Sequence, residues 1–254
     1  MLHTELLRTK LPKEKFMALE KFVSEYINDP NVVGITLTGS FIHGDAGPNA
    51  DLDVFIILEK SSTRTRGNIF IDGQEIEYFI NPIIQIEQYY KEEYPEKINT
   101  AHMFSNCVVL FEKGTELKRL INLAKRYIDK PLPDLSEYDI YACRYFLDDL
   151  RKDLLDSLDR KDKFSFELIS SEITMEMIRY FGKVKKFYPA KPKRLLNQFE
   201  LIDKSFTEKL KLYLESSGPI NQRYILLNDC ISYIENLIGG PRPDNYSYTG
   251  DLST

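Results

Sequence analysis

Two aspartates stand at the start of an apolar run, separated by a single residue. The segment reads Asp51-Leu-Asp53 and continues Val-Phe-Ile-Ile-Leu. On an extended strand, residues i and i+2 point to the same face and lie about 7 Å apart along the chain. Two like charges on a buried strand are costly unless a cation neutralises them. Because Mg²⁺ binds through carboxylates together with substrate phosphates, the pair predicts a magnesium site.

A glycine and a serine lie a short distance before these aspartates. Gly39-Ser40 directly follows Val32 to Thr38, whose apolar, β-rich composition predicts a buried strand. Glycine at such a turn lets backbone N–H groups approach a ligand closely, and a helix beginning there adds a positive dipole. The Ser40 hydroxyl could donate to a phosphate oxygen, and capping that helix is compatible with this contact. A phosphate-binding turn followed by a two-carboxylate strand predicts transfer from a nucleoside triphosphate.

The string from Gly39 to Asp53 resembles the nucleotidyltransferase core of the DNA polymerase β superfamily. Small bacterial members of that superfamily often read G-S-x-A-R-G-x-x-x-x-x-S-D-h-D, where h is apolar. The match without a gap covers Gly39, Ser40, Gly44, Asp51 and Asp53. Either half of the string alone would be unspecific, and it is the combination that carries the resemblance.

Two positions depart from the family pattern. His43 stands where arginine is common, and Ala50 stands where serine is common. The first change replaces a fixed positive charge with an imidazole, which we interpret as a polar wall of the site rather than a general base. The resemblance implies a nucleotide-binding set formed by Gly39, Ser40, His43, Asp51 and Asp53.

The family also uses a third acid on a later, adjacent strand. Glu75 and Glu77 are the candidates, and both have the same parity, so strand alternation does not separate them. We favour Glu77 because it lies further inside the expected strand and precedes the apolar residues Tyr-Phe-Ile. Glu75 lies next to the Asp-Gly turn, where an exposed edge charge is expected. The resemblance then implies that Asp51, Asp53 and Glu77 are the catalytic residues and the ligands of two Mg²⁺ ions.

The activity that the resemblance implies is transfer of a nucleoside monophosphate, with AMP favoured, from an NTP to a hydroxyl group. The expected acceptor is a small molecule, such as an aminoglycoside- or lincosamide-like antibiotic, because a helical segment follows the core as in the enzymes that modify those compounds. Two alternatives stay open. One is an enzyme that adenylylates a protein, and the other is a nucleotide-binding protein without catalysis.

The residue pattern predicts an α+β fold in two parts, a mixed sheet with flanking helices and then a helical bundle. In the first part, helices are expected at 14–28, 83–94 and 115–128, and strands at 32–38, 51–58, 68–71, 75–80 and 107–112. In the second part, helices are expected at 137–158, 164–181, 193–199, 205–215 and 221–237. We therefore predict a nucleotidyltransferase domain over 1–131, a helical bundle over 132–241 and a loosely ordered tail over 242–254.

The amino-acid composition limits the classes of partner that the protein is expected to bind. The net charge of −5 argues against a polynucleotide substrate, because proteins that follow a nucleic-acid backbone carry a basic face. No stretch approaches the roughly 20 apolar residues of a membrane span, and the N-terminus lacks the apolar core of a secretion signal, so a cytoplasmic protein is expected. The three cysteines lack metal-ligand spacing and are expected to be buried thiols. We expect an NTP, with ATP favoured, and a small acceptor as partners, and a homodimer is compatible with the sequence. His102 is expected to be structural or exposed.

Overall fold

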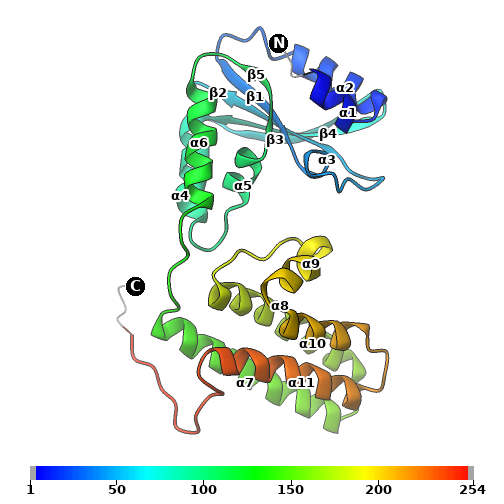
Figure 1. Cartoon of the computed structure of the whole chain (residues 1–254), viewed down its shortest axis with the longest axis vertical. Helices are drawn as coiled ribbons and strands as arrows, with labels where there is room; N and C mark the ends of the chain where they lie inside the picture. Colours follow the sequence, from blue (N-terminus) through cyan, green and yellow to red (C-terminus); the bar gives the residue numbers. More distant parts are fainter. Residues whose placement is uncertain (1–3, 251–254) are drawn as a thin grey trace. The chain divides into compact units, whose positions relative to one another are not determined.

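The computed structural model describes residues 4–250, and these divide into two compact units that meet at Lys130 and Pro131 (Figure 1). The first unit contains α1 (Thr4–Lys10), α2 (Lys13–Ser24), β1 (Val32–Thr38), α3 (Ser40–His43), β2 (Leu52–Leu58), β3 (Thr65–Ile71), β4 (Gln74–Pro82), α4 (Ile83–Glu93), α5 (Asn99–Ser105), β5 (Val108–Glu112) and α6 (Glu116–Ile128). The second contains α7 (Glu137–Asp159), α8 (Lys163–Lys185), α9 (Pro192–Ile202), α10 (Lys204–Glu215) and α11 (Ile220–Leu237). The predicted α+β class is confirmed.

The first unit is built on a mixed sheet of five strands within the described residues, in the order β3-β4-β2-β1-β5. Strand β2 runs parallel to β4, and the other neighbouring pairs are antiparallel. Strand β1 lies inside the sheet and is buried along its whole length. Successive side chains of β2 point to opposite faces of the sheet. Val54 and Ile56 pack in the core with α1 and α2, and Phe55 and Ile57 pack in the core with α4, α5 and α6. Helices therefore cover both faces of the sheet (Figure 1).

The predicted hairpin between β3 and β4 is confirmed. Its turn consists of Asp72 and Gly73, which both have positive φ angles, 50° and 76°. A two-residue turn of this kind matches the twist of the flanking strands and fixes their register. Strand β3 begins at Thr65, three residues earlier than predicted, because its first residues pair with β4 although they lack an apolar alternation.

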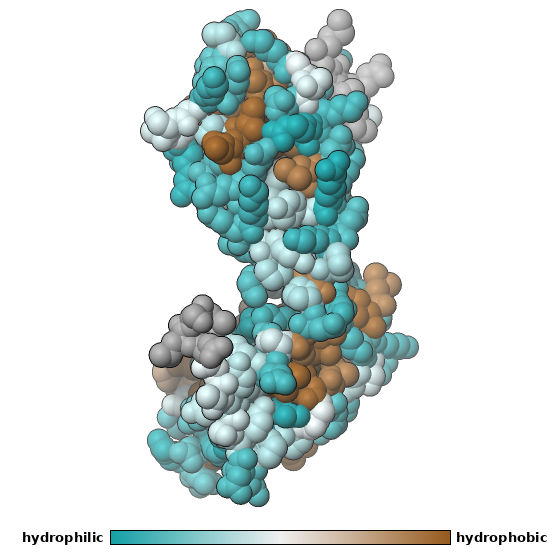
Figure 2. Space-filling view, turned by 90° about the vertical axis from the view of Figure 1, so that its left-hand side faces the viewer, coloured by the Kyte–Doolittle hydropathy of each residue, from teal (hydrophilic) through white to brown (hydrophobic). Residues whose placement is uncertain are grey.

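The second unit is helical throughout its regular structure and has its own apolar core. The core combines side chains of all five helices, among them Leu147, Phe181, Phe199, Phe206 and Ile231. Helix α7 begins with a capping box in which Ser136 and Asp139 exchange hydrogen bonds, which fixes the first residue of the unit's first helix. Several large apolar side chains remain exposed on this unit, and Figure 2 shows hydrophobic groups reaching its surface.

Residues 239–250 contain neither helix nor strand, yet they contact α7. Arg144 donates from Nε to the Gly240 carbonyl at 3.0 Å and from Nη2 to the Ile238 carbonyl at 2.9 Å. The rings of Tyr246 and Tyr248 lie with their centroids 5.2 and 5.4 Å from that of Tyr141. Residues 251–254 of the predicted tail lie outside the described residues. No helix of the described chain has the length and apolar character that crossing a bilayer requires.

Candidate active site

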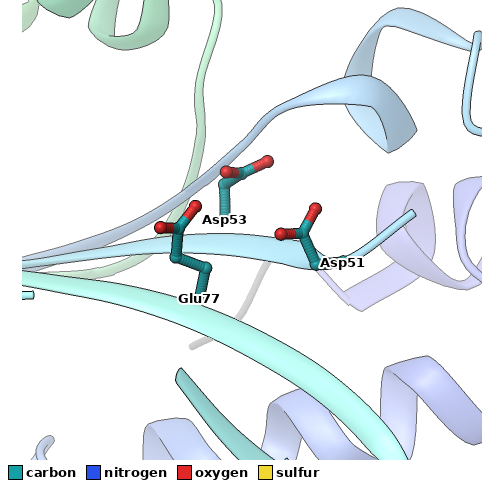
Figure 3. Close-up of side chains that lie close together, drawn as sticks. All are labelled: Asp51, Asp53 and Glu77. Atoms are coloured by element: carbon teal, nitrogen blue, oxygen red, sulfur yellow. The ribbon is translucent and has the colours of Figure 1, made fainter. Parts of the chain in front are cut away.

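Strand register brings three carboxylates together at one end of β2 and β4. Asp53 is the direct neighbour of Glu77 across the parallel pair, and Asp51 immediately precedes β2. Each of the three residues offers one carboxylate oxygen, and these oxygens all lie within 4.8 Å of one another. Figure 3 shows the three side chains rising from the same face of the sheet toward a common space. All three are half-buried, so the site is open to solvent on one side.

The structure separates the two candidate glutamates. Glu77 joins the aspartates, whereas the Glu75 carboxylate accepts a hydrogen bond of 2.9 Å from Asn68 Nδ2 on the neighbouring strand. Register explains the difference, because the residue level with Asp53 on β4 is Glu77. Parity alone could not distinguish them, since both glutamates point to the same face.

Gly39 packs directly against one of the aspartates. Its φ angle is 89°, and a Cβ built on it would lie 1.9 Å from Asp53 Oδ2. A side chain here would strain the backbone and would displace the Asp53 carboxylate. Ser40 follows as the first residue of α3, a single-turn helix that ends at Gly44 with a φ angle of 77°. The predicted turn thus lies against the carboxylates rather than merely near them in sequence.

The donor set fits a divalent cation. Opposed oxygens around an octahedral Mg²⁺ are about 4.2 Å apart, at metal–oxygen distances of about 2.1 Å. Three oxygens on one octahedral ion include cis pairs only about 3.0 Å apart, so these carboxylates, whose oxygens lie within 4.8 Å of one another, would move closer together by side-chain rotation to bind an ion. Three carboxylates leave further coordination positions for water and phosphate oxygens, as Mg²⁺ prefers.

Two lysines from the N-terminal helices hold the loop that carries these residues. Lys15 Nζ donates to the carbonyl of Ala50 at 2.7 Å and also lies over the ring of Phe41, 5.3 Å from its centroid. Lys10 Nζ donates to the carbonyl of Ile42 at 2.8 Å. The loop between Ser40 and Asp51 is thereby anchored at both ends. These lysines were missed by sequence reasoning because they lie far from the motif and carry no signal of their own.

His43 has an aromatic neighbour that the sequence did not reveal. The ring of His102, on α5, lies 5.4 Å from the ring of His43, centroid to centroid, with the planes tilted by 31°. Both side chains are exposed. Helix α5 was not predicted, since seven residues give too little periodicity, and His102 therefore had no visible partner. The structure places two imidazoles beside the Gly39-Ser40 turn.

The cysteines do not contribute nucleophiles at neutral pH. Cys143 and Cys230 are buried and Cys107 is half-buried, and all three are free thiols. Burial raises the pKa of each thiol to about 12, so the reactive thiolate form is scarce.

Comparison with known proteins supports the assignment of the fold and the family. The nucleotidyltransferase domain family matches residues 17–161, more than half of the chain, and the match extends through α7 of the second unit. A solved structure of a nucleotidyltransferase-like protein from Exiguobacterium sibiricum aligns with a TM-score of 0.50 at 15% identity, covering 87% of this chain and 73% of that one. At this identity the likeness concerns the fold alone.

No curated protein sequence matches the chain. The family match confirms the resemblance on which the sequence interpretation depends, and the solved structure agrees with it in fold. The chain belongs to the nucleotidyltransferase domain family of the DNA polymerase β-type superfamily.

Proposed function

We propose that this protein transfers a nucleoside monophosphate, preferably AMP, from a magnesium–NTP complex to a hydroxyl group of a small acceptor. The observation that carries the proposal is the cluster of Asp51, Asp53 and Glu77, with Gly39 packed against Asp53. Loss of one acid would favour a protein that only binds nucleotide, and here the acidic set is complete. The negative net charge supports a small acceptor over a polynucleotide.

The order of the strands suggests how the reactants lie. Gly39 and Ser40 follow β1. Asp51 immediately precedes β2, Asp53 lies within it, and Glu77 belongs to β4 on the far side of β2 from β1. In-line displacement requires the entering and leaving oxygens on opposite sides of the α-phosphorus. Pyrophosphate would therefore leave on the β1 side, where the Ser40 hydroxyl and nearby backbone N–H groups can donate to it. The acceptor would enter on the β4 side.

The reaction then balances with the residues present. The acceptor oxygen forms a bond to the α-phosphorus and the bond to the pyrophosphate oxygen breaks, while a second ion, or Glu77 directly, would help the acceptor hydroxyl lose its proton to solvent. Asp51 and Asp53 hold the cation-bound triphosphate in line for this attack. Asp51, Asp53 and Glu77 would hold divalent ions, which we propose to be two Mg²⁺, and these would neutralise phosphate charge and make the acceptor hydroxyl more acidic. Positioning and electrostatics account for most of such catalysis.

Thermal stability with each of ATP, GTP, CTP and UTP, with and without Mg²⁺, tests the proposal. The wild-type melting temperature should rise with one nucleotide only when Mg²⁺ is present, because ligand binding to the folded state stabilises it. The Asp51→Asn/Asp53→Asn variant should lose that shift. The selected nucleotide then enters a screen of hydroxylated acceptors for pyrophosphate release. A shift that survives in the double variant would show that the carboxylates do not form the site.

A further inference from the structure

An arginine on the edge strand binds the third acid. Arg66 of β3 donates from Nε to Glu77 Oε1 at 2.8 Å, and its Nη2 lies 2.6 Å from the same oxygen. Both contacts go to Oε1, so the other oxygen of this carboxylate is not used by the arginine. Figure 3 shows the Glu77 carboxylate with one of its oxygens directed toward Asp53.

The guanidinium group is also held from a second side. Its Cζ lies 5.1 Å from the ring centroid of Phe79, a neighbour of Glu77 on the same face of β4. The Phe79 ring stacks on Phe55 at 4.6 Å with planes 15° apart, and Phe55 meets the edge of Phe104 at 5.1 Å. Phe55 and Phe104 are buried, so the stack belongs to the core that α4, α5 and α6 cover. Arg66 thus contacts a ring that packs on the interior, although its own side chain is 71% exposed.

Parallel register explains why these contacts coincide with the acidic cluster. Asp53 is level with Glu77, and Phe55 is level with Phe79. One row of side chains therefore carries the carboxylates, and the next row carries the stacked rings. Arg66 spans both rows, touching Glu77 and Phe79 together. An ion pair with this exposure contributes little to folding, so its effect is expected on the geometry of Glu77 rather than on stability.

We propose that Arg66 is a positioning residue, which holds Oε1 of Glu77 so that the remaining oxygen is presented to the divalent ion shared with Asp51 and Asp53. This inference rests on the proposed function. Hydrogen-bond partners of metal-ligating side chains fix the orientation of the ligand, and their loss typically costs 10–100-fold in metal affinity. A guanidinium that binds one carboxylate oxygen leaves the other with a defined direction.

Mn²⁺ is the probe for the test, with free Mn²⁺ measured by electron paramagnetic resonance in the presence of saturating α,β-methylene-ATP. The wild type is expected to bind two ions per chain. In Arg66→Met, the affinity for the more weakly bound Mn²⁺ should fall about tenfold. Arg66→Lys should have an intermediate affinity, because the lysine ammonium keeps the charge but cannot make the contact through two nitrogens. Circular dichroism spectra and melting temperatures should match those of the wild type.

The matched control is Arg64→Met. Arg64 lies two residues earlier, donates to the Tyr89 hydroxyl and stacks on the ring of Tyr89, with no contact to an acid of the site. It should leave Mn²⁺ affinity unchanged. A purely electrostatic effect of Arg66 would give the opposite pattern, because removing a cation would tighten Mn²⁺ binding in Arg66→Met and leave Arg66→Lys like the wild type.

A second comparison shows whether Arg66 acts through Glu77. On a Glu77→Gln background, Arg66→Met should cause no further loss of Mn²⁺ affinity. Unchanged or tighter binding in Arg66→Met, or a full tenfold loss on the Glu77→Gln background, overturns the inference while leaving the proposed function intact. If the wild type binds Mn²⁺ no better than Asp51→Asn/Asp53→Asn, both the proposed function and this inference are wrong.

Discussion

The two units of the chain are specified by different means. In the first, the functional side chains depend on strand register, since Asp53 meets Glu77 only because β2 and β4 align at that level. In the second, helices pack around an apolar core, and exposed apolar residues such as Leu201 and Phe164 are tolerated at 90% and 75% exposure. Strand register determines which individual side chains lie opposite one another, whereas helical periodicity determines only which face of a helix is buried. Substitutions of the acidic residues in the first unit should therefore affect chemistry, and substitutions in the apolar core of the second unit should affect stability.

The largest effect on stability is expected from the helical core. Phe199 is fully buried and its ring contacts those of Phe181, Phe187 and Phe206. Phe199→Ala should lower the free energy of unfolding by about 3–5 kcal/mol, because it removes packing and leaves a cavity. Leu201→Ala on the same helix should change it by less than about 0.5 kcal/mol. Urea unfolding followed by circular dichroism measures both, and equal losses would refute the contrast between core and surface.

Asp53→Asn should do the reverse, leaving stability near that of the wild type and removing activity. The neutral amide cannot offset the charge of a bound cation, so transfer should fall on the order of 10²–10³-fold or more. Initial rates of pyrophosphate release, with the acceptor found by the screen, give this number. Retention of more than about a tenth of the wild-type rate would contradict the role of Asp53 as a metal ligand.

Substitution of two glycines distinguishes the effect of backbone strain from the effect of crowding at the acidic cluster. Gly39→Ala and Gly44→Ala both place a side chain at a positive φ angle, which costs about 1–3 kcal/mol. Only the first also brings a Cβ against Asp53, since nothing lies within 4 Å of a Cβ at Gly44. We expect both variants to be destabilised and only Gly39→Ala to lose Mn²⁺ binding, measured as above. Equal Mn²⁺ affinity in the two variants would show that the close approach is unimportant.

A smaller effect is expected from the lysine that anchors the loop. Lys15→Met keeps most of the aliphatic stem on Phe41 but removes the hydrogen bond to the Ala50 carbonyl, so unfolding should become easier by about 1.5 kcal/mol. The control is Lys13→Met, an exposed position at the start of the same helix. The urea unfolding midpoints of the two variants measure this difference in stability. Indistinguishable midpoints would mean that the loop does not depend on Lys15.

The smallest effect is a pH dependence in the helical unit. Burial alone would raise the pKa of Asp203, but Lys185, the Tyr233 hydroxyl and the N–H of Phe206 together hold it below its ordinary value. A depressed pKa stabilises the folded state above the unfolded-state value, near 3.9, and this contribution is lost as the pH falls through the folded-state value. Asp203→Asn should flatten the decline of the urea midpoint below about pH 4. An unchanged slope would remove Asp203 as its cause.

Sequence reasoning reached the parts of the site that are local in the chain. Asp51, Asp53, Gly39 and Ser40 lie in one short string, and strand periodicity places the two aspartates on one face. The choice of Glu77 over Glu75 needed an argument about position within the strand, whereas the register gives the neighbour of Asp53 directly.

What sequence reasoning missed are contacts between segments. Arg66 meets Glu77 because of the β3–β4 hairpin. His43 meets His102 because of a short helix without clear periodicity. Lys15 reaches the Ala50 carbonyl because of the packing of α2. None of these has a spacing rule that a single sequence displays. The position of such partners is a property of the folded chain.

The two-residue turn at Asp72 and Gly73 has a consequence for how such a site can change over time. Strand β3 is an edge of the sheet, and this two-residue turn fixes its register with β4. Inserting one residue in the turn would reverse which face each β3 side chain occupies, moving Arg66 away from Glu77 while the three acids stay where β2 and β4 hold them. A change in hairpin length could therefore remove Arg66 from Glu77 without displacing the three acids. It could also bring a different β3 side chain next to Glu77.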